Sequence, residues 1–317
     1  MRLLFRIVVT IGLLLHVASP ARGDFSVGLE AYAGRDYISA AKEFAALAEQ
    51  GHQYAQYNLA FLYESGRGVP KDDKEALRLY RLAAEQELAL AQFRVGYLYE
   101  KGRGTPQDYG NAAHWYRRAA EQGHVEAQIN LGWLYAEGKG VPEDHSETIR
   151  WFRQAALQGH ASGQFNLGIL YDNGHGVSRD YAEAARWYGL AAEQGHAEAQ
   201  FNFAAMYAQN QGVPQDFPKA IYWYRQAADQ GHSSAQLNLG LLYWEGQGAP
   251  QDYLQAHVWF NLAAAQGNQK ARQARDLIAR EMTPAQIAES QRIAREWKPQ
   301  RHDRRSDPTP ANVLIEI

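Results

Sequence analysis

Apolar residues recur at helical spacing along most of the chain. In residues 125–160, which represent the other copies, one apolar helical face consists of Ala127, Leu131, Leu134 and Tyr135. After a polar stretch, a second apolar face consists of Trp151, Phe152, Ala155 and Ala156. The pattern predicts two short amphipathic helices joined by a loop, which is a helical hairpin.

Typical capping residues stand at the ends of both predicted helices. Gly138 tolerates the left-handed backbone that ends the first helix, and Pro142 prevents that helix from resuming. Asp144 and Glu147 have the spacing of a capping box, in which each side chain accepts a hydrogen bond from the other residue's backbone N–H. The same box is expected at Asp72 with Glu75, Asp180 with Glu183, and Asp252 with Gln255.

The hairpin recurs every 36 residues without insertion. The period is marked by the pairs Gly51-His52, Gly123-His124, Gly159-His160, Gly195-His196 and Gly231-His232, with Glu87-Leu88 and Gly267-Asn268 as altered copies. Stacked repeats carry this signature, because each repeat buries its apolar faces against its neighbours. We therefore predict an all-α fold, a right-handed α/α superhelix (solenoid) of about six helical-hairpin repeats.

The period also sets the predicted boundaries. The full repeats are residues 53–88, 89–124, 125–160, 161–196, 197–232 and 233–268. Residues 24–52 are expected to form an N-terminal capping hairpin. Residues 269–298 are expected to form two C-terminal capping helices, one over 271–282 and one that opens at Thr283-Pro284. Residues 299–317 have the charged, proline-containing composition of a disordered tail.

The repeat carries a specific motif: Ala-Gln-x-Asn-Leu-Gly-x-Leu-Tyr, then Gly-x-Gly-Val-Pro-x-Asp, then Trp-Tyr-x-x-Ala-Ala-Glu-Gln-Gly-His. Over about residues 28–268 it resembles the Sel-one-like repeat (SLR) family, which is related to the tetratricopeptide repeats. The resemblance implies a non-enzymatic scaffold that holds a protein or peptide partner. Such relatives serve as adaptors, assembly factors or regulators, in the bacterial envelope or in contact with a host.

The first residues have the layout of a secretory signal peptide. Arg2 and Arg6 precede an apolar run over residues 7–15, and small residues follow up to Gly23. We expect residues 1–23 to be a signal peptide cleaved after Gly23, which places the mature protein in the periplasm or outside the cell; an uncleaved membrane anchor is the alternative. Elsewhere the chain has no apolar stretch long enough to span a membrane.

Composition narrows the possible partners and chemistry. The net charge of −3 gives no reason to expect nucleic acid, and the absence of cysteine removes disulfides and thiol nucleophiles. A basic C-terminal segment offers a weaker alternative, binding to anionic lipid or glycan: Arg292, Arg295, Lys298, Arg301, Arg304 and Arg305. Asp303 and Asp307 dilute its charge.

The recurring polar residues favour architecture over chemistry. Histidines of adjacent repeats would lie about 8 to 10 Å apart, whereas zinc ligands lie about 2 Å from the metal, so we expect structural histidines and no metal site. The Gly-x-Gly loops follow no strand, which argues against a dinucleotide site. We therefore expect no enzyme and no cofactor. The alternative is an envelope hydrolase that acts on cell wall or a β-lactam with non-recurring polar residues.

Each first helix carries a further apolar pair outside the hairpin core. The earlier member is expected to pack against the adjacent repeat, as at Tyr57, Phe93, Ile129 and Phe165. The later member varies more between copies and is expected to line a concave protein-binding groove. The predicted groove residues are Phe61, Tyr97, Trp133, Ile169 and Leu241, with Trp244 beside them.

Overall fold

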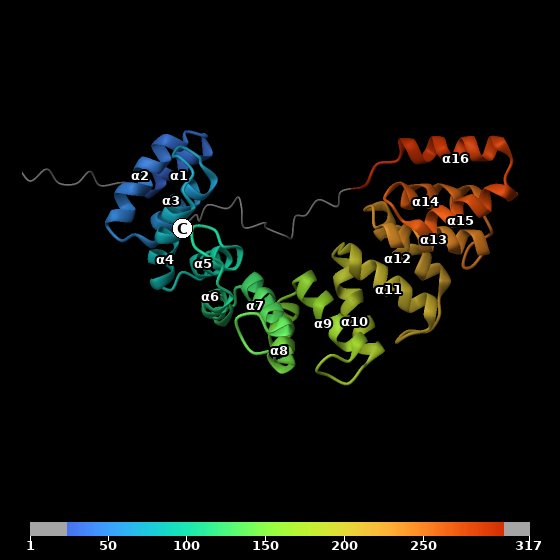
Figure 1. Ribbon diagram of the computed structural model, residues 1–317, viewed down its shortest axis with the longest axis horizontal. Helices are drawn as coiled ribbons and strands as arrows, with labels where there is room; N and C mark the ends of the chain where they lie inside the picture. Colours follow the sequence, from blue (N-terminus) through green and yellow to red (C-terminus); the bar gives the residue numbers. More distant parts are fainter. Residues whose placement is uncertain (1–23, 301–317) are drawn as a thin grey trace, which may run out of the picture. The chain divides into compact units, whose positions relative to one another are not determined.

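The computed structural model describes residues 24–300, and within this range the chain is helical (Figure 1). In chain order the helices are α1 Phe25–Ala33, α2 Tyr37–Glu49, α3 Gln53–Ser65, α4 Asp73–Glu85, α5 Ala89–Lys101, α6 Tyr109–Glu121, α7 Val125–Glu137, α8 His145–Leu157, α9 Ala161–Asn173, α10 Tyr181–Glu193, α11 Ala197–Gln209, α12 Phe217–Asp229, α13 Ser233–Glu245, α14 Tyr253–Ala265, α15 Gln269–Ile278 and α16 Pro284–Glu296, with a 3-10 turn at Ala279–Glu281. These elements confirm the predicted all-α solenoid.

The chain divides into two compact units. Of the described residues, 24–86 belong to one unit and 87–300 to the other, so the boundary falls just before Glu87-Leu88, where the Gly-His pair is altered. Within each unit, helices consecutive in the chain pack on one another, as α7 on α8 and α8 on α9. Each hairpin therefore buries its apolar faces against the preceding and following hairpins of its unit.

Helix ends follow the sequence signals, with one correction. Gly138 adopts the left-handed conformation with φ of 63°, and Asp144 Oδ1 accepts from the backbone N–H of Ser146 and Glu147 at 2.8 and 3.1 Å. The Glu147 carboxylate, however, accepts from Arg150 and from the Trp151 indole, at 3.2 and 3.0 Å, instead of returning to Asp144. Charge-assisted pairing with arginine outcompetes the expected backbone bond.

Two of the other three expected boxes show the same departure, and at the third Asp252 accepts the Gln255 N–H at 2.9 Å. The side chains of Glu75 and Glu183 accept hydrogen bonds from Arg78 and Arg186, three residues on. Within the described helices, the reciprocal capping box is present at Thr283 and Gln286 at the start of α16. The aspartates are therefore helix caps, as predicted, whereas the glutamates stabilise their helices through ion pairs.

The second glycine of the Gly-x-Gly loop allows one repeat to approach the next. Gly140 has φ of +70°, and a Cβ atom there would lie 2.2 Å from the backbone carbonyl carbon of Tyr109 in α6. No side chain fits at that distance. The two glycines of the loop thus have different roles: Gly138 ends a helix, and Gly140 packs against the preceding hairpin.

Four of the five recurring histidines cap a helix N-terminus with their side chains, and His160 holds the N-cap position of α9 without this bond. The Nδ1 atoms of His52, His124, His196 and His232 accept the backbone N–H of the third following residue, at 3.1 to 3.3 Å. His124, His196 and His232 also stack on Phe93, Phe165 and Phe201 of the preceding repeat. Burial lowers the pKa of His124, which favours the neutral ring that can accept this bond. The histidines therefore join adjacent hairpins, as expected.

A column of glutamines forms a second connection, which we call the glutamine ladder. In each repeat, the glutamine that follows the second helix donates to a buried glutamine of the first helix at 2.7 to 2.9 Å: Gln86 to Gln56, Gln122 to Gln92, Gln158 to Gln128, Gln194 to Gln164, Gln230 to Gln200 and Gln266 to Gln236. The buried residue reaches the preceding repeat in turn, as Gln128 does when its Nε2 donates to the carbonyl of Ala120 at 3.1 Å. The ladder satisfies buried polar groups at the joint between repeats.

The C-terminal helices α15 and α16 cover the last repeat. Buried Ser290 of α16 contacts His257 of α14, with 2.6 Å between Oγ and Nδ1. Burial lowers the pKa of His257, and the positive charge of Arg275 acts in the same direction. At the end of the described residues, the N–H of Gln300 donates to the Asp229 carbonyl at 2.7 Å. The first capping helix ends earlier than predicted, at Ile278, and continues as a 3-10 turn.

The predicted signal peptide, residues 1–23, and nearly all of the predicted tail lie outside the described residues. Among residues 24–300, no helix has the length and apolar character needed to cross a bilayer.

Candidate functional site

The structure separates the predicted groove residues into several environments. Phe61 is only 3% exposed and lies beneath Tyr32 of α1. Tyr97 is half-buried under the side chains of Arg94 and Lys101. Neither residue therefore presents an open aromatic surface.

Leu241 and Trp244 lie together near the end of the stack. Both pack against an apolar cluster that includes Ile278 and Met282 at the C-terminal cap. Trp244 also meets the ring of Phe260 edge to face. The C-terminal cap thus covers part of the surface that the sequence analysis predicts as a groove.

Trp133 and Ile169 are brought together in one pocket of 440 Å³ between α7, α8 and α9. Trp133 remains 42% exposed and meets the Phe152 ring edge to face, with 5.4 Å between centroids. Ala136, Phe152 and Leu170 complete the apolar part of the pocket. Its volume falls in the range of ordinary ligand pockets, about 300 to 1,000 Å³. This pocket, which we call the Trp133 pocket, is the candidate site.

The Trp133 pocket forms where a recurring polar contact is missing. In three of the other repeats a buried tyrosine hydroxyl donates to a carboxylate of the first helix: Tyr80 to Glu64, Tyr116 to Glu100 and Tyr188 to Asp172, at 2.6 to 3.1 Å. Burial, reinforced by the Glu100 charge, raises the pKa of Tyr116, so this hydroxyl stays protonated. In residues 125–160 the same two positions hold Phe152 and Ala136. Loss of both polar groups leaves apolar space.

This site can be recognised when the repeats are compared with one another. The sequence pattern marks Trp133 as a variable apolar position, but it does not show that Ala136 removes a side chain beside it. The alanine at position 136 becomes informative only once the structure shows that the tyrosine and the carboxylate of other repeats are in contact. Ala136 and Phe152 are therefore site residues that the sequence pattern missed.

The rim of the Trp133 pocket is polar and acidic. Glu137, Glu143, His145 and His175 line it, and none of the described lining residues is lysine or arginine. The His145 Nε2 atom lies 3.4 Å from a Glu143 oxygen. The rings of His145 and His175 are nearly parallel, with centroids 6.5 Å apart. The inner lining is mainly apolar but includes the buried polar side chains of Thr148 and Asn166. This lining, with two exposed carboxylates beside it, suits a ligand that has an apolar stem and a positive end.

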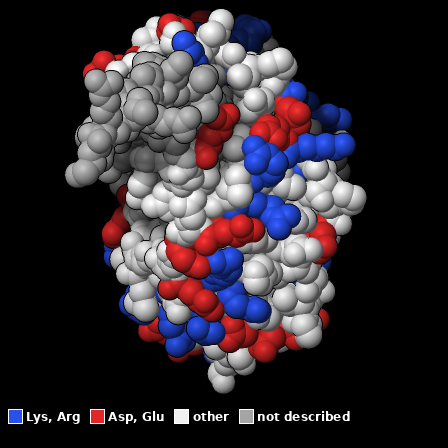
Figure 2. Space-filling view, turned by 90° about the vertical axis from the view of Figure 1, so that its left-hand side faces the viewer, with Lys and Arg blue, Asp and Glu red and all other residues white. Residues whose placement is uncertain are grey.

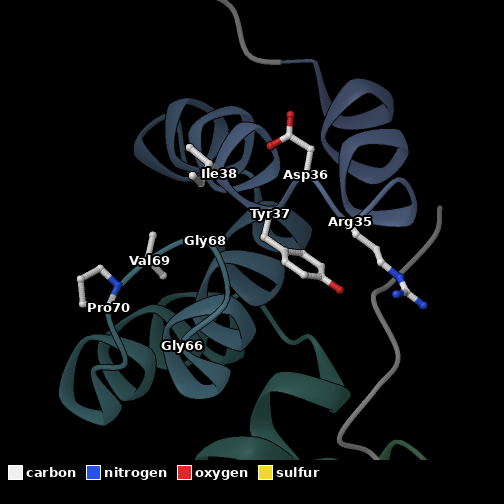
Figure 3. A pocket seen from close by; sticks show the side chains of 8 residues that line it. All are labelled: Arg35, Asp36, Tyr37, Ile38, Gly66, Gly68, Val69 and Pro70. Atoms are coloured by element: carbon white, nitrogen blue, oxygen red, sulfur yellow. The ribbon is translucent and has the colours of Figure 1, made fainter.

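Two further hollows are linked to the packing between repeats. One, of 540 Å³, lies between the turn at Arg35–Ile38 and the loop that contains Gly68, with Tyr37 directed away from Val69 and Pro70 (Figure 3). A Cβ on Gly68 would meet the Tyr37 carbonyl, so this hollow borders the close approach of loop and helix. The other, of 320 Å³, lies beside the glutamine ladder and includes exposed Tyr222.

The described residues offer no group of three or more histidine, aspartate or glutamate side chains that could hold a metal ion. Ser290 and His257 have the residue types of a nucleophile and its base, but their side chains are almost completely inaccessible. A substrate could not reach them without displacement of α16. Their contact fastens α16 to α14.

Charges of both signs are interspersed on the surface. On the face in Figure 2, lysine and arginine side chains lie among aspartates and glutamates, without one large patch of either sign. Among the described residues, many charges pair along single helices, as Glu289 does with Arg292 at 2.7 Å. Recognition by a long-range field is therefore less favoured than recognition by local contacts.

Comparison with known proteins agrees with the repeat architecture. The Sel1 repeat family matches residues 53–88, 89–124, 125–160, 161–196, 197–232 and 233–268. A solved Sel1 repeat protein from Oxalobacter formigenes is 36% identical, with a TM-score of 0.67 over 76% of this chain and 96% of that chain. A protective antigen of uropathogenic Escherichia coli with an SLR fold is 29% identical, with a TM-score of 0.56 over 86% of this chain and 67% of that chain. No curated protein gives a significant match.

Proposed function

The chain belongs to the Sel1 repeat family, and we propose that it is an exported scaffold that holds a segment of a partner protein in the Trp133 pocket. Proteins of this family generally mediate protein–protein interactions and are typically non-enzymatic. The observation that carries the proposal is the exposed Trp133 side chain above an apolar pocket. Tryptophan beside a desolvated pocket is a frequent centre of binding energy.

The proposed setting is the bacterial envelope or the contact with a host, where the protein acts as an adaptor, assembly factor or regulator. The signal-like residues 1–23 support export. The similarity to a protein described as a protective antigen of uropathogenic Escherichia coli supports the part of the proposal that concerns a host.

Trp133→Ala tests the binding site. We expect the variant to bind the partner at least about 30-fold more weakly, since loss of a central tryptophan costs about 2 kcal/mol or more. Helical content should be unchanged and melting should change little, because Trp133 is 42% exposed. The partner is first captured by wild-type protein from the native envelope fraction, and each variant is then titrated against it.

Leu157→Ala is the matched control for Trp133→Ala. Leu157 is an apolar residue of the same hairpin, 71% exposed, that does not line the pocket. If Trp133→Ala and Leu157→Ala bind the partner as tightly as the wild type does, the pocket is not the binding site.

Cell fractionation tests export. We expect the mature chain to be recovered from the periplasm or the medium and to begin at Asp24, which N-terminal sequencing would show. Recovery of the uncleaved chain in the cytosol alone would refute export, and recovery of it in the inner membrane would favour an uncleaved anchor.

A further inference from the structure

The Trp133 pocket differs from the other repeats in its charged residues as well as in its size. Glu137 and Glu143 stand at positions that hold Lys101 and Gln107 in the preceding repeat, and Asn173 and Arg179 in the following one. Glu137 recurs only as Glu245 in the last full repeat, and Glu143 does not recur, so the two carboxylates occur together only here and the repeat architecture does not require the pair. Their joint occurrence at one pocket points to a ligand.

The basic residue found in the Gly-x-Gly loop of the first three repeats is also replaced at the Trp133 pocket. The middle residue of the Gly-x-Gly loop is Arg67, Arg103 or Lys139 in the first three repeats, and His175 in the fourth. Arg67 and Lys139 lie over the rings of Tyr37 and Tyr109 at the start of the preceding hairpin's second helix. At the Trp133 pocket the corresponding pair is His175 on His145. Among the described residues, no arginine or lysine therefore lines the pocket, and Lys139 pairs with Glu137 from outside it.

On this basis we propose that the Trp133 pocket binds an arginine or lysine side chain from an extended segment of a partner protein. The inference rests on the proposed function, because it specifies the chemistry of the segment bound there. The methylene stem of the ligand would lie on Phe152, Ile169 and Leu170. Its positive end would lie near the Glu137 and Glu143 carboxylates, within reach of the exposed Trp133 ring.

The existing contacts of Glu137 and Glu143 still allow a positively charged ligand to reach their carboxylates. Glu137 contacts Lys139 at 2.6 Å, but Lys139 extends toward Tyr109 and does not line the pocket. Both Glu137 and Glu143 are substantially exposed, at 46% and 61% of their side chains. An incoming cation can therefore exchange with water at their oxygens, and its attraction to them should weaken as salt is added.

Titration of the full chain with short acetylated and amidated peptides tests the inference. The peptides share a Gly-Ser-Val background and differ at one central residue, which is arginine, lysine, norleucine or glutamate. Binding is followed by the indole N–H resonance of Trp133 in NMR spectra, assigned with Trp133→Phe. We expect the arginine and lysine peptides to bind about tenfold more tightly than the norleucine peptide, and the glutamate peptide to bind most weakly.

The double variant Glu137→Gln/Glu143→Gln identifies the source of that preference. It should lose about tenfold in affinity for the arginine peptide and keep its affinity for the norleucine peptide. Glu245→Gln is the matched control, since Glu245 occupies the position of Glu137 in the last full repeat and should leave both affinities unchanged.

The outcomes separate this inference from the proposed function. Equal binding of the arginine and norleucine peptides, wild-type affinity in the double variant, or no shift of the Trp133 resonance with any peptide would overturn the basic-ligand proposal. If Trp133→Ala still weakens partner binding in that case, the protein-binding function stands without the charge preference. If the partner binds Trp133→Ala normally while the arginine peptide binds in the pocket, only the assignment of the partner to this pocket fails.

Discussion

Replacement of Gly140 by alanine is expected to lower the free energy of unfolding by about 4 kcal/mol. The left-handed backbone costs a residue with a Cβ roughly 1 to 2 kcal/mol, and overpacking adds about 1 to 3 kcal/mol. The second contribution should be at the upper end, because the atoms that the Cβ would meet are the backbone of Tyr109 and Gly110, at 2.2 to 2.4 Å. Backbone in a packed helix cannot move aside as a flexible side chain can. Urea unfolding followed by circular dichroism measures the change.

Gly159→Ala isolates the conformational contribution. Gly159 has φ of +84°, but a Cβ there would have no neighbour within 4 Å. Its substitution should therefore cost only about 1 to 2 kcal/mol. Equal destabilisation by the two substitutions would show that close approach of the loop to the preceding hairpin contributes nothing to stability.

The second large effect is expected at the glutamine ladder. Gln128→Ala should lower the free energy of unfolding by about 3 kcal/mol, because it removes a buried side chain together with its hydrogen bonds to two other segments. Gln128 is only 2% exposed, donates to the Ala120 carbonyl and accepts from Gln158 at 2.9 Å. The same unfolding measurement applies.

Gln107→Ala is the control for the ladder. Gln107 also donates two hydrogen bonds, to the Glu100 carbonyl and to the Tyr109 hydroxyl, but its side chain is exposed. Water can replace these bonds, so the cost should stay below about 1 kcal/mol. If Gln128→Ala lowers the free energy of unfolding by as little as Gln107→Ala does, the ladder is a consequence of the packing of the repeats and does not stabilise it.

Helix ends were predictable because their causes are local. Asp144 caps α8 and Gly138 ends α7 through contacts with residues a few positions away. The failure of the capping box is also informative. Glu147 is close enough in sequence to reach Asp144, but Arg150 and Trp151 are equally close once the helix has formed. Spacing alone does not distinguish such competing partners.

The recurring glutamines were visible in the sequence without revealing their role. Gln128 bonds to Ala120, eight residues earlier, and to Gln158, thirty residues later. Gln158 meets Gln128 once α7 and α8 form their hairpin, whereas Ala120 of α6 meets it only when that hairpin stacks on the preceding one. A period in the sequence therefore identifies residues that the architecture needs, and the stacked structure shows which joint they stabilise.

By itself, the sequence determined the repeat, its length and the order of helices, because amphipathic spacing and capping act within a few residues of each other. Which of the variable apolar residues stays accessible was decided only by the tertiary structure. Phe61 is covered by Tyr32 and Leu241 packs at the C-terminal cap, whereas Trp133 remains open beside Ala136. Exposure depends on what a neighbouring helix places over a side chain, and no local pattern contains that information.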